Sequence, residues 1–234
     1  MPVQPSPCLV FWDIDKTLVD IGSIGREIYA AAFRAVTGLE LGRLPEMAGK
    51  TDHDLILSSL RLHAIPEPEG RLPDFYSALA DATEERREAI QRQGRRLPGA
   101  REAVERLAET PGFVQSVVTG NIQPTARVKL AAFNLASPID FEIGGYGSDD
   151  GERATLVRLA LRRARQKYGV PYPPERVTVI GDTPHDIAGA KANGIRAIGV
   201  ASGSSPASEL QASGADAVLD SLVDTEALVQ LLLG

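Results

Sequence analysis

Short runs of apolar residues alternate along the chain with longer segments in which apolar positions recur at helical spacing. Each apolar run leads into a polar or glycine-rich turn, and the runs fall at 9–12, 114–118, 177–180 and 195–200. The helix-like segments fall at 99–109, 124–133, 153–168 and 186–193. Buried parallel strands that alternate with helices are typical of α/β proteins. The pattern predicts a Rossmann-like, doubly wound parallel sheet.

One long segment interrupts this alternation. Residues 21–94 are almost entirely helix-like and contain no convincing strand, and a Leu-Pro-Gly sequence at 97–99 marks the return to the alternating pattern. We therefore expect an α/β core built from residues 1–20 and 95–234. Residues 21–94 should form an inserted helical cap.

Composition excludes several classes of protein. The net charge of −6 argues against a protein that neutralises a nucleic-acid backbone, and no apolar run approaches the roughly 20 residues of a membrane span. The single cysteine rules out intramolecular disulfides and cysteine-built zinc sites. The first residues, MPVQPSPC, lack the features of a secretory signal. We expect a cytoplasmic enzyme, a monomer or homodimer, with no nucleic-acid or membrane partner.

The ends of the first two main strands carry candidate chemistry. Asp13 and Asp15 follow the first strand, and two carboxylates at this spacing can turn toward one ligand. One can attack phosphorus while the other gives and takes a proton. Thr119, Gly120 and Asn121 follow the second strand. A hydroxyl and backbone amides that glycine makes accessible suit the oxygens of a phosphoryl group.

A third strand leads into another acidic turn, Gly181-Asp182, with Asp186 at the start of the next helix. Gly181 permits close backbone approach, and Asp182 can ligate a hard cation. Asp186 is a candidate helix N-cap, a role compatible with support of the metal site. In a parallel sheet all these strand ends meet at one edge, where ligands bind.

Taken together and in this order, these motifs resemble those of the haloacid dehalogenase superfamily. The resemblance covers the whole chain and points to the subclass with a helical cap after the first motif, as in phosphoglycolate phosphatases and beta-phosphoglucomutases. It implies that Asp13 is the nucleophile, Asp15 the general acid/base, and Thr119 with its neighbouring amides the phosphate site. It further implies that Mg²⁺ binds Asp13, the Asp15 carbonyl and Asp182, with Asp186 positioning the metal's water shell.

One element departs from the pattern of that family. A lysine is usual some 20 to 30 positions before the metal-binding aspartate, but residues 147–155 contain none. Arg153, at the predicted start of a helix, is the best substitute, because its guanidinium can supply charge and hold two oxygens. Arg158 is the alternative.

The predicted cap contains the sequence Ala-Gly-Lys-Thr-Asp-His at 48–53, just before an apolar helix. A glycine turn that presents Lys50 resembles the cap loops that select the substrate's leaving group in this subclass. Helix capping by Thr51 or Asp52 is an equally good interpretation of the segment.

The function predicted from these residues is that of a magnesium-dependent phosphatase acting on a small phosphorylated metabolite through an aspartyl-phosphate. Two alternatives remain open. The first is a phosphomutase of the same superfamily, and the second is a catalytically weakened protein that binds a phosphorylated ligand.

Overall fold

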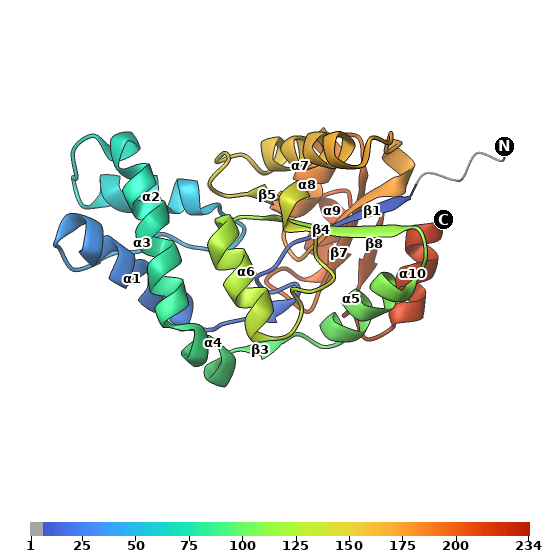
Figure 1. Cartoon of the computed structure of the whole chain (residues 1–234), viewed down its shortest axis with the longest axis horizontal. Coiled ribbons are helices and arrows are strands. Elements are labelled where there is room, and N and C mark those ends of the chain that lie inside the picture. The colour runs from blue at the N-terminus through green and yellow to red at the C-terminus, as the bar shows by residue number, and fades with distance from the viewer. Residues whose placement is uncertain (1–6) are drawn as a thin grey trace.

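A sheet of six parallel strands forms the centre of the molecule (Figure 1). The structure is a computed structural model and describes residues 7–234. The strand order is β5-β4-β1-β6-β7-β8, and the bounds are β1 Cys8–Trp12, β4 Phe113–Thr119, β5 Gly145–Tyr146, β6 Val177–Gly181, β7 Arg196–Val200 and β8 Ala217–Leu219. This arrangement confirms the predicted α/β fold class.

Helices cover both faces of the sheet, because alternate residues of the central strand are buried on opposite sides. Val10 and Trp12 join a core that includes helices α5 and α10, whereas Leu9 and Phe11 join a second core that includes α7, α8 and α9. A strand buried on both faces needs apolar residues at every position. The bounds are α5 Ala100–Glu109, α6 Gln123–Ala132, α7 Arg153–Tyr168, α8 Pro184–Ala192, α9 Ala207–Ala212 and α10 Thr225–Leu233.

Four further helices lie to one side of the sheet (Figure 1), and their bounds are α1 Ile24–Thr37, α2 Asp52–Leu62, α3 Leu72–Glu85 and α4 Arg87–Gln93. Short antiparallel strands, β2 Val19–Asp20 and β3 Arg95–Arg96, pair where the chain leaves and re-enters the core. This arrangement supports the proposed insertion, and residues 21–94 are called the cap below. Helix α6 packs against both α3 and α4, so the cap rests on a core helix.

The sequence pattern did not anticipate the last strand and its helices. β8 contains only three residues, all partly buried, at the edge of the sheet, so it carries no long apolar run. The signal-peptide expectation depends mainly on residues 1–6, which lie outside the described part of the chain.

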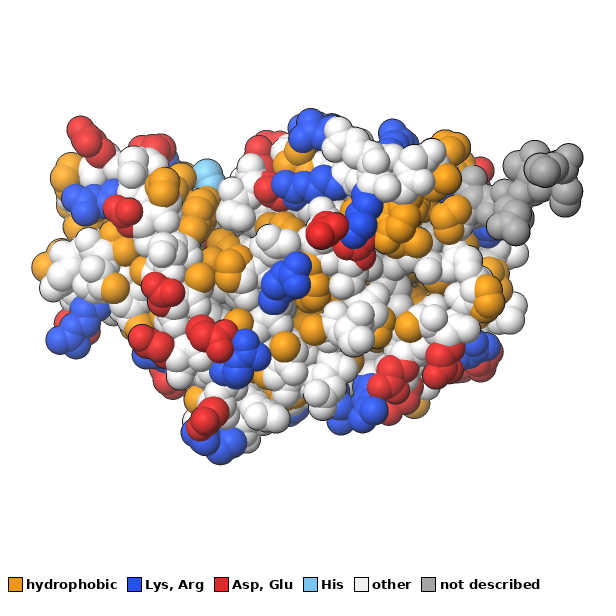
Figure 2. Space-filling view, viewed as in Figure 1, with side chains coloured by type: hydrophobic (Ala, Val, Ile, Leu, Met, Phe, Trp, Pro, Cys, Tyr) orange, Lys and Arg blue, Asp and Glu red, His pale blue; other side chains and the backbone are white. Residues whose placement is uncertain are grey.

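The surface mixes charges of both signs. Lys and Arg side chains are interspersed with Asp and Glu over the face drawn in Figure 2. Among residues 7–234 there is no helix with the length and apolar character needed to cross a membrane.

Candidate active site

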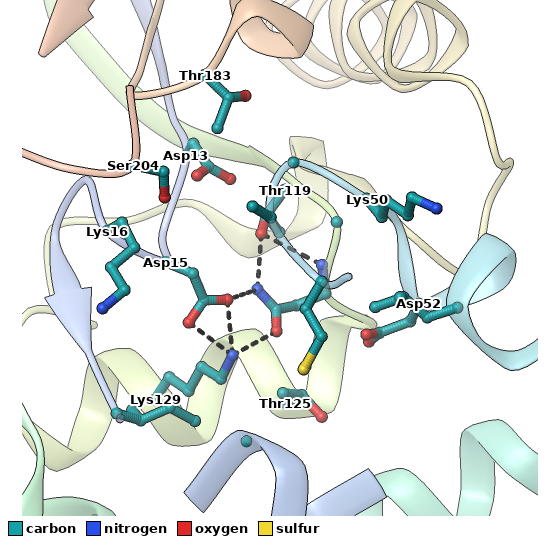
Figure 3. A pocket seen from close by; sticks show the side chains of 18 of the residues that line it. Asp13, Asp15, Lys16, Lys50, Asp52, Thr119, Thr125, Lys129, Thr183 and Ser204 are labelled. Carbon is teal, nitrogen blue, oxygen red and sulfur yellow. Dashed lines mark hydrogen bonds and ion pairs between the residues drawn. The ribbon is translucent and has the colours of Figure 1, made fainter. Parts of the chain in front are cut away.

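The turn after β1 directs two aspartates toward one cavity (Figure 3). The Asp13 amide donates to the Ile180 carbonyl of β6 at 2.8 Å, which fixes the backbone where the strand ends. Lys16 adopts a left-handed backbone conformation with φ of 65°, and the chain reverses there. The Asp13 side chain is buried, whereas the Asp15 side chain is 41% exposed. The two carboxylates therefore occupy different environments, one buried and one open to solvent.

Three buried aspartates from two motifs converge beside this turn. Carboxylate oxygens of Asp13, Asp182 and Asp186 lie within 4.8 Å of one another. Asp182 Oδ1 accepts from the Thr17 hydroxyl at 3.2 Å, and its Oδ2 accepts from the Ser204 amide at 2.6 Å. A cluster of hard carboxylate oxygens is the donor set that Mg²⁺ prefers.

The two oxygens of Asp186 have different partners. Asp186 Oδ2 accepts from the Thr183 amide at 3.1 Å and from its hydroxyl at 2.7 Å, which completes the capping box of α8. Asp186 Oδ1 is buried without a hydrogen-bond partner. A Cβ at Gly181 would lie 2.4 Å from Asp186 Cγ, so only glycine fits there. Asp186 thus caps the helix with one oxygen, while the other lies within the acidic cluster, 3.4 Å from Arg153 Nε.

Crowding of these carboxylates changes their protonation. Burial raises the pKa of Asp13 well above its usual range, and the neighbouring Asp186 raises it further, although Arg153 opposes the change. Burial also raises the pKa of Asp182 to about 6. Like charges in a low-dielectric site disfavour ionisation unless a cation offsets them. The donor set, the unpartnered oxygen and these pKa directions all fit a bound divalent metal ion.

Arg153 lies at the first position of α7 and supplies a cation to the same cluster. Its Nη1 lies 3.5 Å from Asp13 Oδ1, and its Nε lies 3.4 Å from Asp186 Oδ1. The first distance exceeds the roughly 2.7 to 3.2 Å of a tight pair. Arg153 also donates to the Val118 carbonyl at 3.3 Å and is buried. Arg158, the alternative, is exposed and donates to Thr155, so Arg153 is the arginine that faces Asp13.

The loop after β4 lies where phosphate oxygens would need donors. Thr119 is fully buried, and its Oγ1 accepts from the Asn121 side chain at 2.8 Å. A Cβ at Gly120 would lie 2.2 Å from the Lys50 carbonyl, so the absence of a side chain lets the cap loop approach the core. Asn121 Nδ2 also donates to Asp15 Oδ2 at 2.7 Å. This loop therefore touches both the cap and the acid/base candidate.

Sequence reasoning missed Lys129, which donates to both carboxylate oxygens of Asp15. Lys129 lies on α6 with a side chain only 7% exposed, and its Nζ donates to Asp15 Oδ1 at 2.8 Å and Oδ2 at 2.7 Å. A third bond reaches Asn121 Oδ1 at 2.7 Å, so all three N–H groups are used (Figure 3). A signal was present in the sequence, because Lys129 stands between Val128 and Leu130 four residues after Thr125 in a predicted helix. That spacing places Thr125 and Lys129 on one helix face.

The cap loop meets the core through its backbone. The Asp52 amide donates to the Gly120 carbonyl at 2.7 Å, and the His53 amide donates to the Gly147 carbonyl at 3.1 Å. Thr51 is the N-cap of α2, as one interpretation of this segment expected. Lys50 is exposed, and its amine extends away from Asp15 and Lys129 (Figure 3). The loop covers the site, with Lys50 at its rim.

A cavity of about 220 Å³ lies between cap and core, and it brings together the residues that sequence motifs had selected separately. Its lining includes Asp13, Asp15, Asp182, Arg153, Lys50 and the loop 119–121, whereas Asp186, the third member of the acidic cluster, is not part of the lining.

A family model described as haloacid dehalogenase-like hydrolase matches residues 10–191, which span most of the chain. The chain belongs to this family. The match confirms the family and the hydrolase class that the sequence motifs predict. Two solved structures have the same fold, a hydrolase from Pseudomonas syringae and a predicted phosphatase from Clostridium acetobutylicum. The first is 22% identical with a TM-score of 0.66, over 96% of this chain and 98% of that one. The second is 17% identical with a TM-score of 0.67, over 96% and 99%.

A curated relative shows a more local similarity. The tyrosine-protein kinase PtkA of Mycobacterium tuberculosis is 35% identical over 86 residues, which make up 37% of this chain and 28% of the relative. The matched region therefore spans little more than a quarter of that protein. So local a similarity does not assign the activity of that relative to this haloacid dehalogenase-like hydrolase.

Proposed function

We propose that this hydrolase is a magnesium-dependent phosphatase that removes phosphate from a small phosphomonoester through an aspartyl-phosphate on Asp13. The observation that carries the proposal is the buried cluster of Asp13, Asp182 and Asp186, within 4.8 Å of one another, beside the guanidinium of Arg153. Asp15, with its partly exposed carboxylate, lines the same cavity. The phosphatase name of the clostridial structure agrees with this proposal.

In the first half-reaction, a carboxylate oxygen of Asp13 attacks phosphorus and the ester P–O bond breaks. Asp15 donates its proton to the departing alcohol oxygen. In the second half-reaction, Asp15 takes a proton from a water molecule whose oxygen attacks the aspartyl-phosphate, which releases inorganic phosphate and restores Asp13. Proton transfer of this kind contributes roughly 10² to 10⁴ in rate.

Asp13, the Asp15 carbonyl and Asp182 would hold the magnesium ion, with Asp186 behind them. When bound, the ion supplies positive charge that reduces repulsion between the phosphoryl oxygens and these carboxylates. Arg153 adds a second positive charge from the protein. Phosphoryl transfer depends mainly on such positioning and charge stabilisation. Thr119, Gly120 and Asn121 would hold the phosphoryl oxygens.

The cap and Lys50 are proposed to act on the rest of the substrate. Backbone contacts of the cap loop with Gly120 and Gly147 cover the cavity, which would exclude bulk water during the reaction. Lys50, at the rim, would attract the anionic phosphate ester as it enters the cavity.

The test is to incubate the protein with p-nitrophenyl phosphate with and without Mg²⁺, and to measure release of phosphate. Turnover should require the metal, and brief reaction with labelled substrate should leave one acid-stable phosphate on the peptide that contains Asp13. Asp13→Asn should abolish both signals because an amide is not a nucleophile. Substantial turnover by Asp13→Asn would refute the covalent mechanism.

A parallel incubation with a sugar phosphate separates the alternatives. A phosphomutase would transfer phosphate between sugar positions with little net release. A non-catalytic binding protein would bind phosphate analogues and give neither turnover nor a phosphorylated peptide.

A further inference from the structure

The part of the cavity beyond Asp15 is roofed by aliphatic side chains of the cap. Ile28 of α1, Leu55 of α2, Leu79 of α3 and Met47 of the cap loop line it. Ile28, Leu55 and Leu79 belong to the larger hydrophobic core, and Met47 packs against that core. A leaving group held in this part of the cavity would contact these aliphatic side chains.

The polar side chains of this compartment already bond one another. Lys129 uses its three N–H groups on Asp15 and Asn121. The two N–H groups of Asn121 reach Asp15 and Thr119, at 2.7 Å and 2.8 Å. These donors are therefore committed within the protein before any substrate enters.

The remaining polar groups at the cap side are paired in the same way. The Tyr29 hydroxyl donates to Asp52, whose other oxygen accepts from the Ile122 amide at 2.7 Å. The hydroxyls of Thr125 and Thr83 lie 3.1 Å apart, and Thr83 in turn donates to the Leu79 carbonyl at 2.6 Å. Within this cluster no side-chain donor is left for a substrate hydroxyl, since a hydroxyl group has only one hydrogen to give. Lys16, which also lines the cavity, is 45% exposed and pairs with Asp20 at 2.7 Å.

From this pairing and the aliphatic roof, we infer that the leaving group of the substrate is a compact apolar alcohol rather than a polyol. The inference rests on the proposed phosphatase function and narrows its substrate class. A polyol would place its extra hydroxyl groups against the aliphatic roof, where each unsatisfied group costs about 1–3 kcal/mol. An apolar group of the same size gains from burial, about 0.8 kcal/mol for each methylene. The volume of about 220 Å³, which the phosphate also has to share, limits the group to a short branched chain or one aromatic ring.

Two alkyl phosphates test this inference at equal size. The leaving groups of 3-methylbutyl phosphate and glycerol 3-phosphate are primary alcohols with the same number of non-hydrogen atoms. Glycerol carries two further hydroxyl groups, whereas the rest of 3-methylbutanol is wholly aliphatic. With Mg²⁺ present, kcat/KM should favour 3-methylbutyl phosphate by about 10- to 100-fold, because each buried hydroxyl costs roughly tenfold. A preference for glycerol 3-phosphate, or equal values, would overturn the inference while leaving the phosphatase intact.

Binding separates this inference from the proposed function. The non-hydrolysable phosphonates with the same two carbon skeletons should show the same order of affinity in calorimetry with Mg²⁺. If neither phosphate ester is turned over but the 3-methylbutyl phosphonate binds more tightly, the catalytic proposal fails and the apolar site stands. Equal phosphonate affinities would contradict the apolar site whatever the turnover.

A pair of variants locates the preference. Met47 is partly buried in the roof, and glutamine has nearly the shape of methionine but adds an N–H donor. Met47→Gln should lower the preference several-fold, whereas Met47→Leu should preserve it. If Met47→Gln leaves the ratio unchanged, the aliphatic roof does not set the preference and the inference is wrong.

Discussion

Lys129 offers the sharpest test of how Asp15 is held. In the structure two of its three hydrogen bonds reach Asp15 and one reaches Asn121, all at 2.7 to 2.8 Å. Lys129→Met keeps most of the volume and removes all three bonds. A hydrogen bond to a charged group contributes about 1.5–3 kcal/mol. The Asp15 side chain is 41% exposed, so water replaces part of the loss. We therefore expect a loss near the lower end of that range, about tenfold to 30-fold in kcat/KM.

The effect on folding should be small, and this separates the role of Lys129 from a structural one. Methionine suits the buried position, and the carboxylate that loses its partner reaches solvent, so the free energy of unfolding in urea should change by less than about 1 kcal/mol. Lys167→Met is the matched control. Lys167 also pairs with two acids, Asp140 at 2.8 Å and Glu142 at 2.6 Å, but lies outside the cavity. That variant should keep normal kcat/KM.

A double-mutant cycle decides whether Lys129 acts through Asp15. If the lysine positions the carboxylate, Lys129→Met should cost far less in an Asp15→Asn background than in the native protein. Additive losses would show that Lys129 contacts the substrate independently of Asp15. An unfolded Lys129→Met protein, or one with native kcat/KM, would refute the positioning role.

Three further predictions concern the acidic cluster and its cation. Arg153→Ala should reduce kcat/KM at least about 10²-fold, because truncating one partner of a buried ion pair costs about 3 kcal/mol or more of binding free energy. Arg153→Lys should restore part of kcat/KM. A harmless Arg153→Ala would exclude Arg153 from the site. Asp15→Asn should slow benzyl phosphate about 10²-fold or more and p-nitrophenyl phosphate much less in the phosphoenzyme-forming step, since p-nitrophenolate departs without a proton; equal losses would remove Asp15 from the acid role. The pKa of Asp182 is raised to about 6, so the folded metal-free protein binds its proton more tightly than the unfolded chain does. The contribution of protonated Asp182 to stability is therefore present below about pH 4 and lost as pH rises through about 6. Because Mg²⁺ binds the ionised carboxylate, it should raise the melting temperature much more at pH 8 than at pH 5. A pH-independent effect of Mg²⁺ would place the ion elsewhere.

The sequence could predict the features that follow from local pattern. The apolar run at 9–12 predicts the buried strand β1. The polar turns after β1, β4 and β6 must then meet at one edge of a parallel sheet. Asp13, Asp15, Thr119 and Asp182 could be selected for this reason. Arg153 could be predicted because a phosphate site that contains several aspartates needs a side-chain cation to offset their negative charge.

The pairing of Lys129 with Asp15 depends on the packing of α6 under the cap, which no local pattern records. Their separation along the chain is 114 residues. The motifs of the family indicate one missing cation, at the position near residue 153, and they do not point to a second on α6. The structure instead has two buried cations with separate tasks. Arg153 faces the cluster of Asp13 and Asp186, and Lys129 binds Asp15.

This division of charge has a consequence for how the acid/base candidate can act. Both oxygens of Asp15 accept bonds from Lys129, and Oδ2 also accepts from Asn121. A carboxyl group that donates a proton to a leaving alcohol must direct one oxygen to that alcohol. Oδ1 accepts only from Lys129 and keeps a second lone-pair site for the proton. Lys129 and Asn121 thus hold the Asp15 side chain in place before substrate arrives. Under the proposed mechanism, Oδ1 would be the oxygen that delivers the proton to the leaving alcohol.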